Sequence, residues 1–256
     1  MKLKPLFLDF ETFWSPTHSL SKMSPIEYAT HPDTEIISLA ARSVNKPAQV
    51  VFGEGNIQRL CANTDWSDKW VIAHNMEGFD AMLLAWRLGA RPAMWGCTLA
   101  MARPIHAKTT GLSLAKLVEH YGIGVKNNAA LINTKGRHLC DFTPEEIEAM
   151  REYNADDTNQ CRDLFLKLLP QTSTDELCII DRTIRMLVEP QFVLDKSLLV
   201  HTLAAERVRK KRSLLALATD LGHPTKDEAD AIEFLRSELA SAPKFAAQLT
   251  ARGVEV

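Results

Sequence analysis

The chain has 256 residues, of which 46% are hydrophobic and 24% are charged, values typical of a globular protein that exclude a disordered chain. Its formal net charge is −2, so any nucleic-acid interface must come from a local group of basic residues. No apolar run reaches the roughly 18 residues of a membrane span, and the acidic N-terminal stretch does not fit a signal peptide. The five cysteines show neither C-x-x-C nor zinc-site spacing. We therefore expect a cytoplasmic protein with no membrane partner.

The first two thirds of the chain read as a mixed α/β domain. Short apolar runs predict strands at 3–10, 36–44, 48–52 and 69–74. The second and third are spaced as a hairpin, and the fourth is apolar throughout, as in a central strand. Amphipathic patterns predict helices at 79–89, 112–122 and 142–170.

The helix at 142–170 has a complete start signal. Thr143 is the expected N-cap, Pro144 the first helical residue and Glu146 the return partner of a capping box, and Pro170 ends the pattern.

The character of the sequence changes after residue 172. Long helical patterns follow, interrupted at Pro190 and Gly222. We predict a domain at 1–172 and an all-helical extension at 173–256.

The stretch "FLDFETF" at 7–13 places two acids inside the first predicted strand. Alternate strand residues share a face, so Asp9 and Glu11 project together and repel each other unless a cation lies between them. Carboxylate oxygens favour Mg²⁺ or Mn²⁺. The alternative is an exposed edge-strand pair. A second Asp-x-Glu at 33–35 lies in a polar turn and is interpreted as loop.

Polar residues follow the predicted central strand in "VIAHNMEGFDAML". Ligand sites of α/β sheets lie at such strand ends. Asn75 offers a hydrogen-bonding amide, Phe79 a flat ring and Asp80 a third carboxylate. The alternative is a turn residue followed by an ordinary helix-start aspartate.

The late helix carries "EYNADDTNQ". Tyr153 and Asp157 are four residues apart and share a face, which Asp156 shares in part. The choice between the two aspartates rests on spacing. The alternative for either one is an ordinary solvent-exposed charge.

Together the three motifs, in this order, resemble the DEDD superfamily of 3′–5′ exonucleases over residues 3–170. The resemblance implies a ribonuclease-H-like fold, a mixed sheet flanked by helices. It implies a metal-binding role for four carboxylates: Asp9, Glu11, Asp80 and Asp157. Tyr153 places the chain in the tyrosine-bearing branch, since Glu152 stands where the other branch has histidine.

The resemblance also implies a mechanism. Two Mg²⁺ or Mn²⁺ ions would assist hydrolysis of a phosphodiester, with Tyr153 orienting the attacking water. Nucleoside 5′-monophosphates would leave from a single-stranded or frayed 3′ end. By motif position, Thr12, Asn75 and Phe79 would contact the last nucleotide. Phe13 and Trp14 are read as buried core in preference to base-stacking residues.

A closer resemblance is to the proofreading domain of phage-type family A DNA polymerases. It rests on "SLSKMSPIEYATHPDTEIISL" at 19–39, on "CTLAMAR" at 97–103 and on a tail similar to the start of a polymerase thumb. That family usually has Asp where Cys97 stands. Palm and finger motifs of a polymerase are not found in the sequence. The resemblance implies a DNA-replication role beside a separate polymerase domain or subunit, in the bacterial host cytoplasm if phage-encoded.

The extension contains one pronounced basic run, "ERVRKKRSLL". Its Arg207, Lys210 and Lys211 are candidates for phosphate contact, and a solvated helix face is the equal alternative. Further lysines that would flank a DNA groove are Lys108, Lys116 and Lys126.

Two rival functions remain. An enzyme of the same fold would trim RNA 3′ ends, but the thumb-like tail favours DNA. A non-catalytic nucleic-acid-binding or polymerase-partner module would be expected to have lost a carboxylate, and all four are present.

Overall fold

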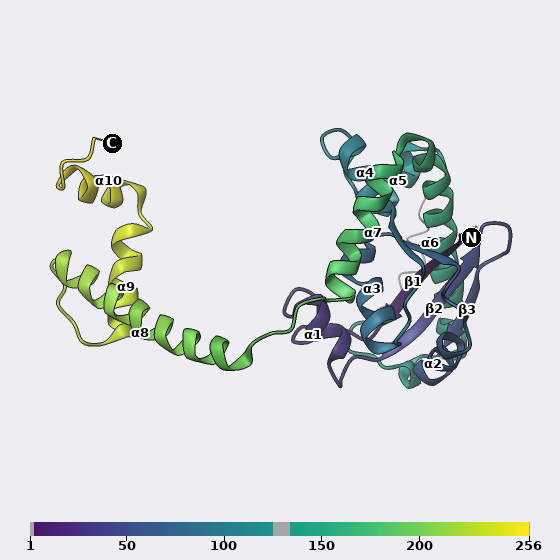
Figure 1. Cartoon of the computed structure of the whole chain (residues 1–256), viewed down its shortest axis with the longest axis horizontal. Helices are drawn as coiled ribbons and strands as arrows, with labels where there is room; N and C mark the ends of the chain where they lie inside the picture. The colour runs from purple at the N-terminus through teal and green to yellow at the C-terminus, as the bar shows by residue number, and fades with distance from the viewer. Residues whose placement is uncertain (1–2, 125–133, 256) are drawn as a thin grey trace. The chain divides into compact units, whose positions relative to one another are not determined.

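The computed structural model describes residues 3–124 and 134–255 (Figure 1). It contains two compact units, Met1–Gln191 and Phe192–Val256. Lys126, one of the candidate groove lysines, lies outside the described residues.

The first unit is built on a mixed β-sheet. Its strands are β1 (Lys4–Thr12), β2 (Ile36–Ser43), β3 (Gln49–Phe52), β4 (Lys69–Ala73) and β5 (Met94–Cys97). They lie in the order β3-β2-β1-β4-β5. β2 is antiparallel to β1 and β3, while β4 is parallel to β1 and β5. The predicted hairpin and the central position of β4 are confirmed, whereas β5 was not predicted.

Helices flank this sheet on both faces (Figure 1). In chain order they are α1 (Pro25–Thr30), α2 (Glu54–Ala62), the 3₁₀ turn η1 (Met76–Gly78), α3 (Asp80–Met82), the π-helical turn η2 (Leu83–Arg87), α4 (Thr98–His106), α5 (Leu114–His120), the 3₁₀ turn η4 (Leu139–Asp141), α6 (Pro144–Leu168), the 3₁₀ turn η5 (Leu169–Gln171) and α7 (Thr174–Val188). The helix predicted at 79–89 is therefore short and continues as a π turn.

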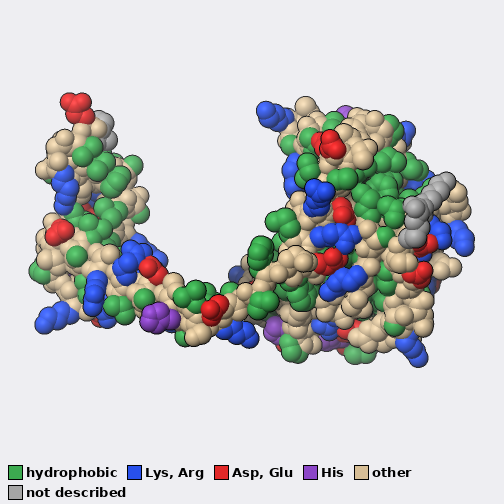
Figure 2. Space-filling model, viewed as in Figure 1, with side chains coloured by type: hydrophobic (Ala, Val, Ile, Leu, Met, Phe, Trp, Pro, Cys, Tyr) green, Lys and Arg blue, Asp and Glu red, His purple; other side chains and the backbone are tan. Residues whose placement is uncertain are grey.

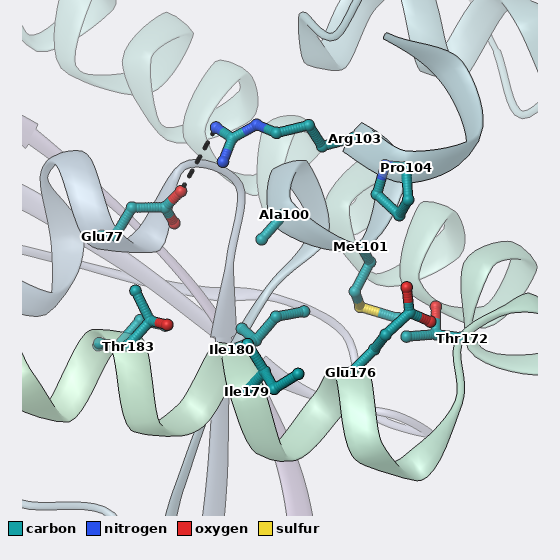
Figure 3. A pocket seen from close by; sticks show the side chains of 11 residues that line it. Glu77, Ala100, Met101, Arg103, Pro104, Thr172, Glu176, Ile179, Ile180 and Thr183 are labelled. Carbon is teal, nitrogen blue, oxygen red and sulfur yellow. Dashed lines mark ion pairs between the residues drawn. The ribbon is translucent and has the colours of Figure 1, made fainter.

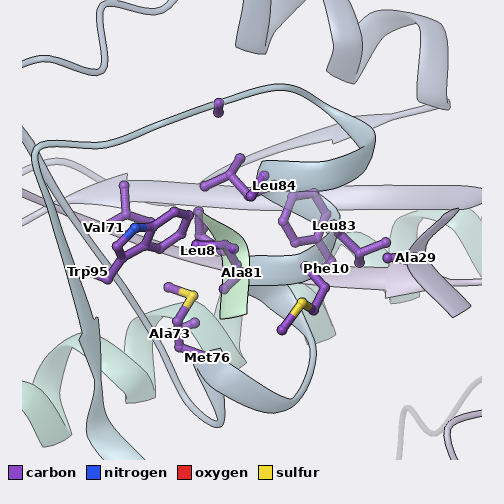
Figure 4. Close-up of a cluster of buried hydrophobic side chains, with 14 of the residues drawn as sticks. Leu8, Phe10, Ala29, Val71, Ala73, Met76, Ala81, Leu83, Leu84 and Trp95 are labelled. Carbon is purple, nitrogen blue, oxygen red and sulfur yellow. The ribbon is translucent and has the colours of Figure 1, made fainter. Parts of the chain in front are cut away.

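Alternation along β1 divides its side chains between two hydrophobic layers. Leu8 and Phe10 join a cluster with residues of β4, β5, α3 and α7 (Figure 4). Phe7 points to the opposite layer and meets Phe165 of α6, with 5.4 Å between the ring centroids. Because side chains alternate, Asp9 and Glu11 lie on the same face of β1 as Phe7, the face that α6 covers.

The predicted start of α6 is confirmed. Thr143 Oγ1 accepts a hydrogen bond from the Glu146 amide, 3.3 Å, and Glu146 Oε2 accepts one from the Thr143 amide, 2.9 Å. This reciprocal capping box, with Pro144 in the first turn, satisfies donors that the helix itself leaves unpaired. The helix ends at Leu168 and is followed directly by η5, which contains Pro170.

Cys97, the departure from the polymerase pattern, is the N-cap of α4. Its Sγ accepts a hydrogen bond from the Ala100 amide at 3.4 Å. Asp is a preferred N-cap residue, so the cysteine performs, more weakly, the capping that aspartate would perform there.

The first unit ends later than the predicted boundary at 172. Ile184 and Val188 of α7 are buried in the main hydrophobic cluster. Asp181 Oδ1 accepts a hydrogen bond from the Trp95 amide of β5 at 2.8 Å. Since α7 covers the sheet, it belongs to the first unit, and the division falls after Gln191.

The second unit is all-helical, as predicted, with α8 (Lys196–Asp220), α9 (Glu228–Leu239) and α10 (Ala242–Thr250). A small cluster around Ala218 and Ala231 joins α8 to α9. Lys and Arg side chains are interspersed with hydrophobic ones on the visible face of this unit (Figure 2). Across the described residues of both units, none of the helices has the length and hydrophobicity needed to cross a membrane.

Candidate active site

The first acidic motif lies at the carboxyl end of β1. Glu11 is the register partner of Ser38 on β2, and the register shifts between Glu11 and Thr12. Asp9 is held by a contact that the sequence analysis missed. With the Asn154 amide oriented so that its oxygen accepts from Ser38 Oγ (2.8 Å), its nitrogen donates to Asp9 Oδ2 (3.0 Å). Asn154, on α6, thus fixes one carboxylate from the helix side.

Asp80 begins α3, immediately after the turn that follows β4. Its side chain is only 2% exposed, and its Oδ1 accepts a hydrogen bond from the Phe10 amide of β1 at 3.3 Å. Burial, reinforced by the negative charge of Glu11, raises the pKa of Asp80 to about 8. The second motif therefore lies close to the first, as the resemblance implied.

The two candidate aspartates of α6 differ in burial. Asn154, Asp157, Thr158 and Cys161 are buried at helical spacing, whereas Asp156 is exposed. Because α6 packs on β1 and β2, this face is turned toward the sheet. Asp157 is therefore the aspartate on the Asp9 side of the helix. Tyr153 lies one turn earlier and is half-buried.

A cavity of about 450 Å³ opens where the first two motifs meet. It is lined by Asp9, Thr12, Trp14, Ser19, Leu20, Ser21, Tyr28, His74, Asn75, Phe79 and Asp80. The structure thus brings three of the predicted substrate residues, Thr12, Asn75 and Phe79, together with two of the carboxylates. Glu11, Tyr153 and Asp157 are not part of this lining.

Asn75 owes its place in the cavity to an unusual backbone. Its φ is 66°, in the left-handed region that few residues other than glycine adopt. A Cβ at Gly78 would come within 2.6 Å of the Asn75 amide nitrogen, so the glycine leaves room for this side chain. Neighbouring His74 is held by Thr98 Oγ1 (2.9 Å) and by the Leu112 carbonyl (3.1 Å).

Phe13 and Trp14 are not buried core, contrary to the sequence-based expectation. Trp14 is 40% exposed at the cavity and donates from Nε1 to Thr134 Oγ1 at 2.9 Å. Phe13 is half-buried and stacks on His138, with ring centroids 4.2 Å apart. Both residues follow the end of β1, where the Phe13 amide still donates to the Glu35 carbonyl at 3.0 Å and Trp14 forms an isolated bridge with Lys135.

The basic candidates Arg207, Lys210 and Lys211 lie on α8 of the second unit, and all three are exposed. Their neighbour Arg209 forms an ion pair with Glu206 at 2.7 Å. They form part of a helix surface of the second unit. The catalytic candidates all belong to the first unit.

A second cavity of about 450 Å³ lies between α4 and α7 (Figure 3). Its walls are mainly apolar, among them Met101 and Ile180, and Glu77 pairs with Arg103 at its edge, 3.7 Å apart. It contains none of the carboxylates of the three motifs. Of these two cavities, the first is the one that the acidic motifs line.

The carboxylates are possible ligands of a metal ion. Within residues 3–124 and 134–255, no three or more His, Cys, Asp or Glu side chains are arranged as a ready-formed metal site. The donors themselves suit a hard cation, because Asp9 and Asp80 line one cavity and the charge of Glu11 reaches Asp80. A divalent ion there would offset the cost of ionising buried Asp80.

Comparison with known proteins supports the fold. No protein-family model and no curated protein sequence matches the chain. Its structure is similar to that of a nuclease in the apo form, with a TM-score of 0.50 and 16% identity over 73% of this chain and 81% of that one. It is also similar to NrnC of Brucella melitensis, with a TM-score of 0.51 and 14% identity over 72% of this chain and 82% of that one.

Two further structures of NrnC, one with bound Mg²⁺ and one bound to pGG, match with a TM-score of 0.50 each. At such low identity these similarities concern the fold. The chain has the ribonuclease-H-like fold of exonuclease-type nucleases, as its sequence motifs predicted.

Proposed function

We propose that this protein is a metal-dependent 3′–5′ exonuclease that releases nucleoside 5′-monophosphates from single-stranded or frayed DNA ends. The observation that carries the proposal is the meeting of Asp9 and Asp80 at one cavity, together with Thr12, Asn75 and Phe79. The fold shared with nucleases adds to it.

The metal-holding role is assigned to Asp9, Glu11, Asp80 and Asp157. When bound, divalent ions at such carboxylates activate water and neutralise charge on the leaving oxygen. Asn154 fixes the direction of the Asp9 carboxylate through its hydrogen bond.

Tyr153 would orient the attacking water. A neutral phenol is a poor general base, so the proposed role is to hold the water by a hydrogen bond.

The cavity suits one unpaired nucleotide. Its volume of about 450 Å³ falls within the range of small-ligand sites. Phe79 offers a ring for stacking, and the Asn75 amide offers both a donor and an acceptor. A terminal base must leave the duplex to enter, and a mismatched base does so at the least cost.

DNA is the proposed substrate on the strength of the polymerase-like motifs at 19–39 and in the tail. On the same ground we propose proofreading beside a polymerase domain or subunit of phage type. The exposed Arg207, Lys210 and Lys211 are proposed to contact phosphates of the longer strand. Trimming of RNA 3′ ends is the alternative that the carboxylates serve equally well.

The test is product analysis with 3′-labelled single-stranded DNA in Mg²⁺. Wild type is expected to release labelled mononucleotide, whereas Asp9→Ala or EDTA abolishes the release. A parallel assay on RNA of the same sequence decides between the two substrates. Absence of release from DNA and RNA in both Mg²⁺ and Mn²⁺ would reject the enzyme and favour a binding module.

A further inference from the structure

Thr12 and Tyr28 form a hydrogen-bonded pair in the wall of the cavity. Thr12 follows Glu11 at the register shift that ends β1, and its side chain is 6% exposed. Tyr28 lies on α1 and is 2% exposed. Their oxygens are 2.8 Å apart, and both residues line the cavity that contains Asp9.

The direction of this hydrogen bond follows from counting protons. The Tyr28 hydroxyl also contacts the Phe13 carbonyl, which can only accept, so Tyr28 donates its single proton there. In the contact with Thr12 the tyrosine oxygen must then accept. The Thr12 hydroxyl donates to it, and the lone pairs that remain on Thr12 Oγ1 can only accept further hydrogen bonds.

Tyr28 retains its proton at neutral pH, since burial raises the pKa of its phenol. The ring is held in place by the packing of α1. Ser24 and Glu27 cap this helix reciprocally, and Thr34 donates to the Tyr28 carbonyl at 2.5 Å. The His18 ring lies 4.9 Å from the Tyr28 ring, centroid to centroid.

The chain around α1 is anchored from the other side by Arg87. Its guanidinium donates to the carbonyls of Ala29 (3.2 Å) and His31 (3.1 Å). Glu54 of α2 pairs with Arg87 at 2.7 Å. The segment 19–39, singled out in the sequence, thus forms a wall of the cavity that is held in place on two sides, and Tyr28 lines the cavity together with Ser19 and Ser21.

We propose that Tyr28 is a positioning residue that keeps Thr12 an acceptor for the sugar hydroxyl of the 3′-terminal nucleotide. This rests on the proposed function. A scissile phosphate at Asp9 and Asp80 places the terminal sugar beside Thr12, because the sugar is bonded to that phosphate. In DNA the one free donor on this sugar is the 3′ hydroxyl. Tyr28 therefore selects ends that carry it.

The test measures binding without hydrolysis. Fluorescence anisotropy in EDTA gives the Kd of two labelled single-stranded oligodeoxynucleotides that differ only in a terminal 3′-OH or 3′-H. Contributions of the base cancel in the ratio of the two Kd values. For wild type we expect a preference for 3′-OH of roughly 3- to 10-fold, the value of one hydrogen bond.

Tyr28→Phe is expected to lower this ratio, because the Thr12 hydroxyl loses its fixed orientation and must reorient to meet the 3′ hydroxyl, which can accept as well as donate. Thr12→Val removes the contact and should bring the ratio close to one, and the double variant should match Thr12→Val. Tyr121→Phe is the matched control. It removes the same atom from a tyrosine bonded to His106 and Gln171, away from the cavity, and should keep the wild-type ratio.

Lack of a 3′-OH preference in wild type would overturn the assignment, and so would an unchanged ratio in folded Tyr28→Phe or Thr12→Val. Failure of the proposed function is a separate result. If wild type discriminates the two ends in EDTA but releases no mononucleotide in Mg²⁺, the proposed hydrolysis is rejected. The role of Tyr28 in binding the 3′ end then still stands.

Discussion

Asp80 is the carboxylate whose surroundings differ most from water. It is buried, its backbone partner is Phe10 of another strand, and the charge of Glu11 is close to it. Such a position costs folding free energy whenever the group ionises without a cation. The site thus holds a carboxyl group whose ionisation is costly without a cation and which a structural role does not require, as is common at functional sites.

Replacing Asp80 by Asn separates function from stability. Its folded-state pKa of about 8 lies above the ordinary 3.8. The stability that wild type gains from the protonated form is complete below pH 3.8 and is lost as the pH rises through about 8. In EDTA, Asp80→Asn should therefore be at least as stable as wild type, with an advantage that grows from pH 5 to pH 9.

Urea unfolding at those two pH values measures this difference, while exonuclease activity should fall by about 100-fold or more. A variant that is less stable than wild type at pH 9 in EDTA would contradict the account.

Gly78 is a residue whose importance the sequence alone did not indicate. Alanine there would place its Cβ within 2.6 Å of the Asn75 amide. We expect Gly78→Ala to displace that amide and raise KM for single-stranded DNA roughly tenfold, equivalent to about 1.4 kcal/mol. Gly55→Ala is the control, since nothing lies within 4 Å of its Cβ position. Equal KM values for the two variants would refute the role of Gly78.

At the residue level, helical spacing and the family resemblance singled out Tyr153 and chose Asp157 over Asp156, and the burial of Asp157 agrees with that choice. Asn154 and Tyr28, in contrast, were missed. Their partners are Asp9, Ser38 and Thr12, and a side chain that acts through tertiary contacts carries no local sequence signal.

At the scale of elements, α6 is the piece that its own sequence specifies best. Its capping box gains a charge partner, since Arg137 pairs with Glu146 at 2.6 Å. That hydrogen bond, with the one from the Thr143 amide, lowers the pKa of Glu146 from 4.5 to about 2. The start of α6, which sets the phase of Asp157, is therefore tied to an ionised glutamate.

A depressed carboxyl pKa makes stability depend on pH in a defined window. The contribution of ionised Glu146 is complete above pH 4.5 and is lost as the pH falls through about 2. We expect Glu146→Gln, which keeps the cap but not the charge, to melt below wild type at pH 7 and together with it near pH 2. A constant difference in Tm across this range would contradict the assignment.

The elements that were missed are short and depend on tertiary contacts. Helix α2 was not predicted, and in the structure Gly53 is its N-cap and Glu54 in its first turn pairs with Arg87. In β5, Gly96 is a poor strand former that is required because a Cβ would lie 2.8 Å from Trp70 Nε1. Both elements, α2 and β5, therefore depend on contacts with residues that are distant in the sequence.

On the scale of the whole molecule, the helical pattern alone led to a wrong prediction of where the first unit ends. A change of composition near 172 indicated a boundary, but α7 buries Ile184 and Val188 in the main core. A helical pattern shows that one face is apolar and not which core that face enters. The sheet order and the two layers, in contrast, agree with the predicted mixed α/β fold.

Two fragments test this boundary. Residues 1–191 should unfold cooperatively and retain mononucleotide release from short oligonucleotides. Residues 1–172 lack Ile184 and Val188, and losing each buried side chain costs about 2–5 kcal/mol, a large part of a typical domain's stability. We expect the shorter fragment to show no cooperative transition by circular dichroism. A stable, active 1–172 fragment would restore the earlier boundary.

The most direct test of the proposed active site compares two neighbouring aspartates. Asp157 is buried on the face of α6 turned toward β1, whereas Asp156 is exposed on the same helix. With 5′-labelled single-stranded DNA and Mg²⁺, wild type and Asp156→Asn should shorten the strand one nucleotide at a time from its 3′ end. Asp157→Asn should be slower by about 100-fold or more. Equal rates for the two variants, or a wild type that leaves the strand intact, would contradict the assignment of this site.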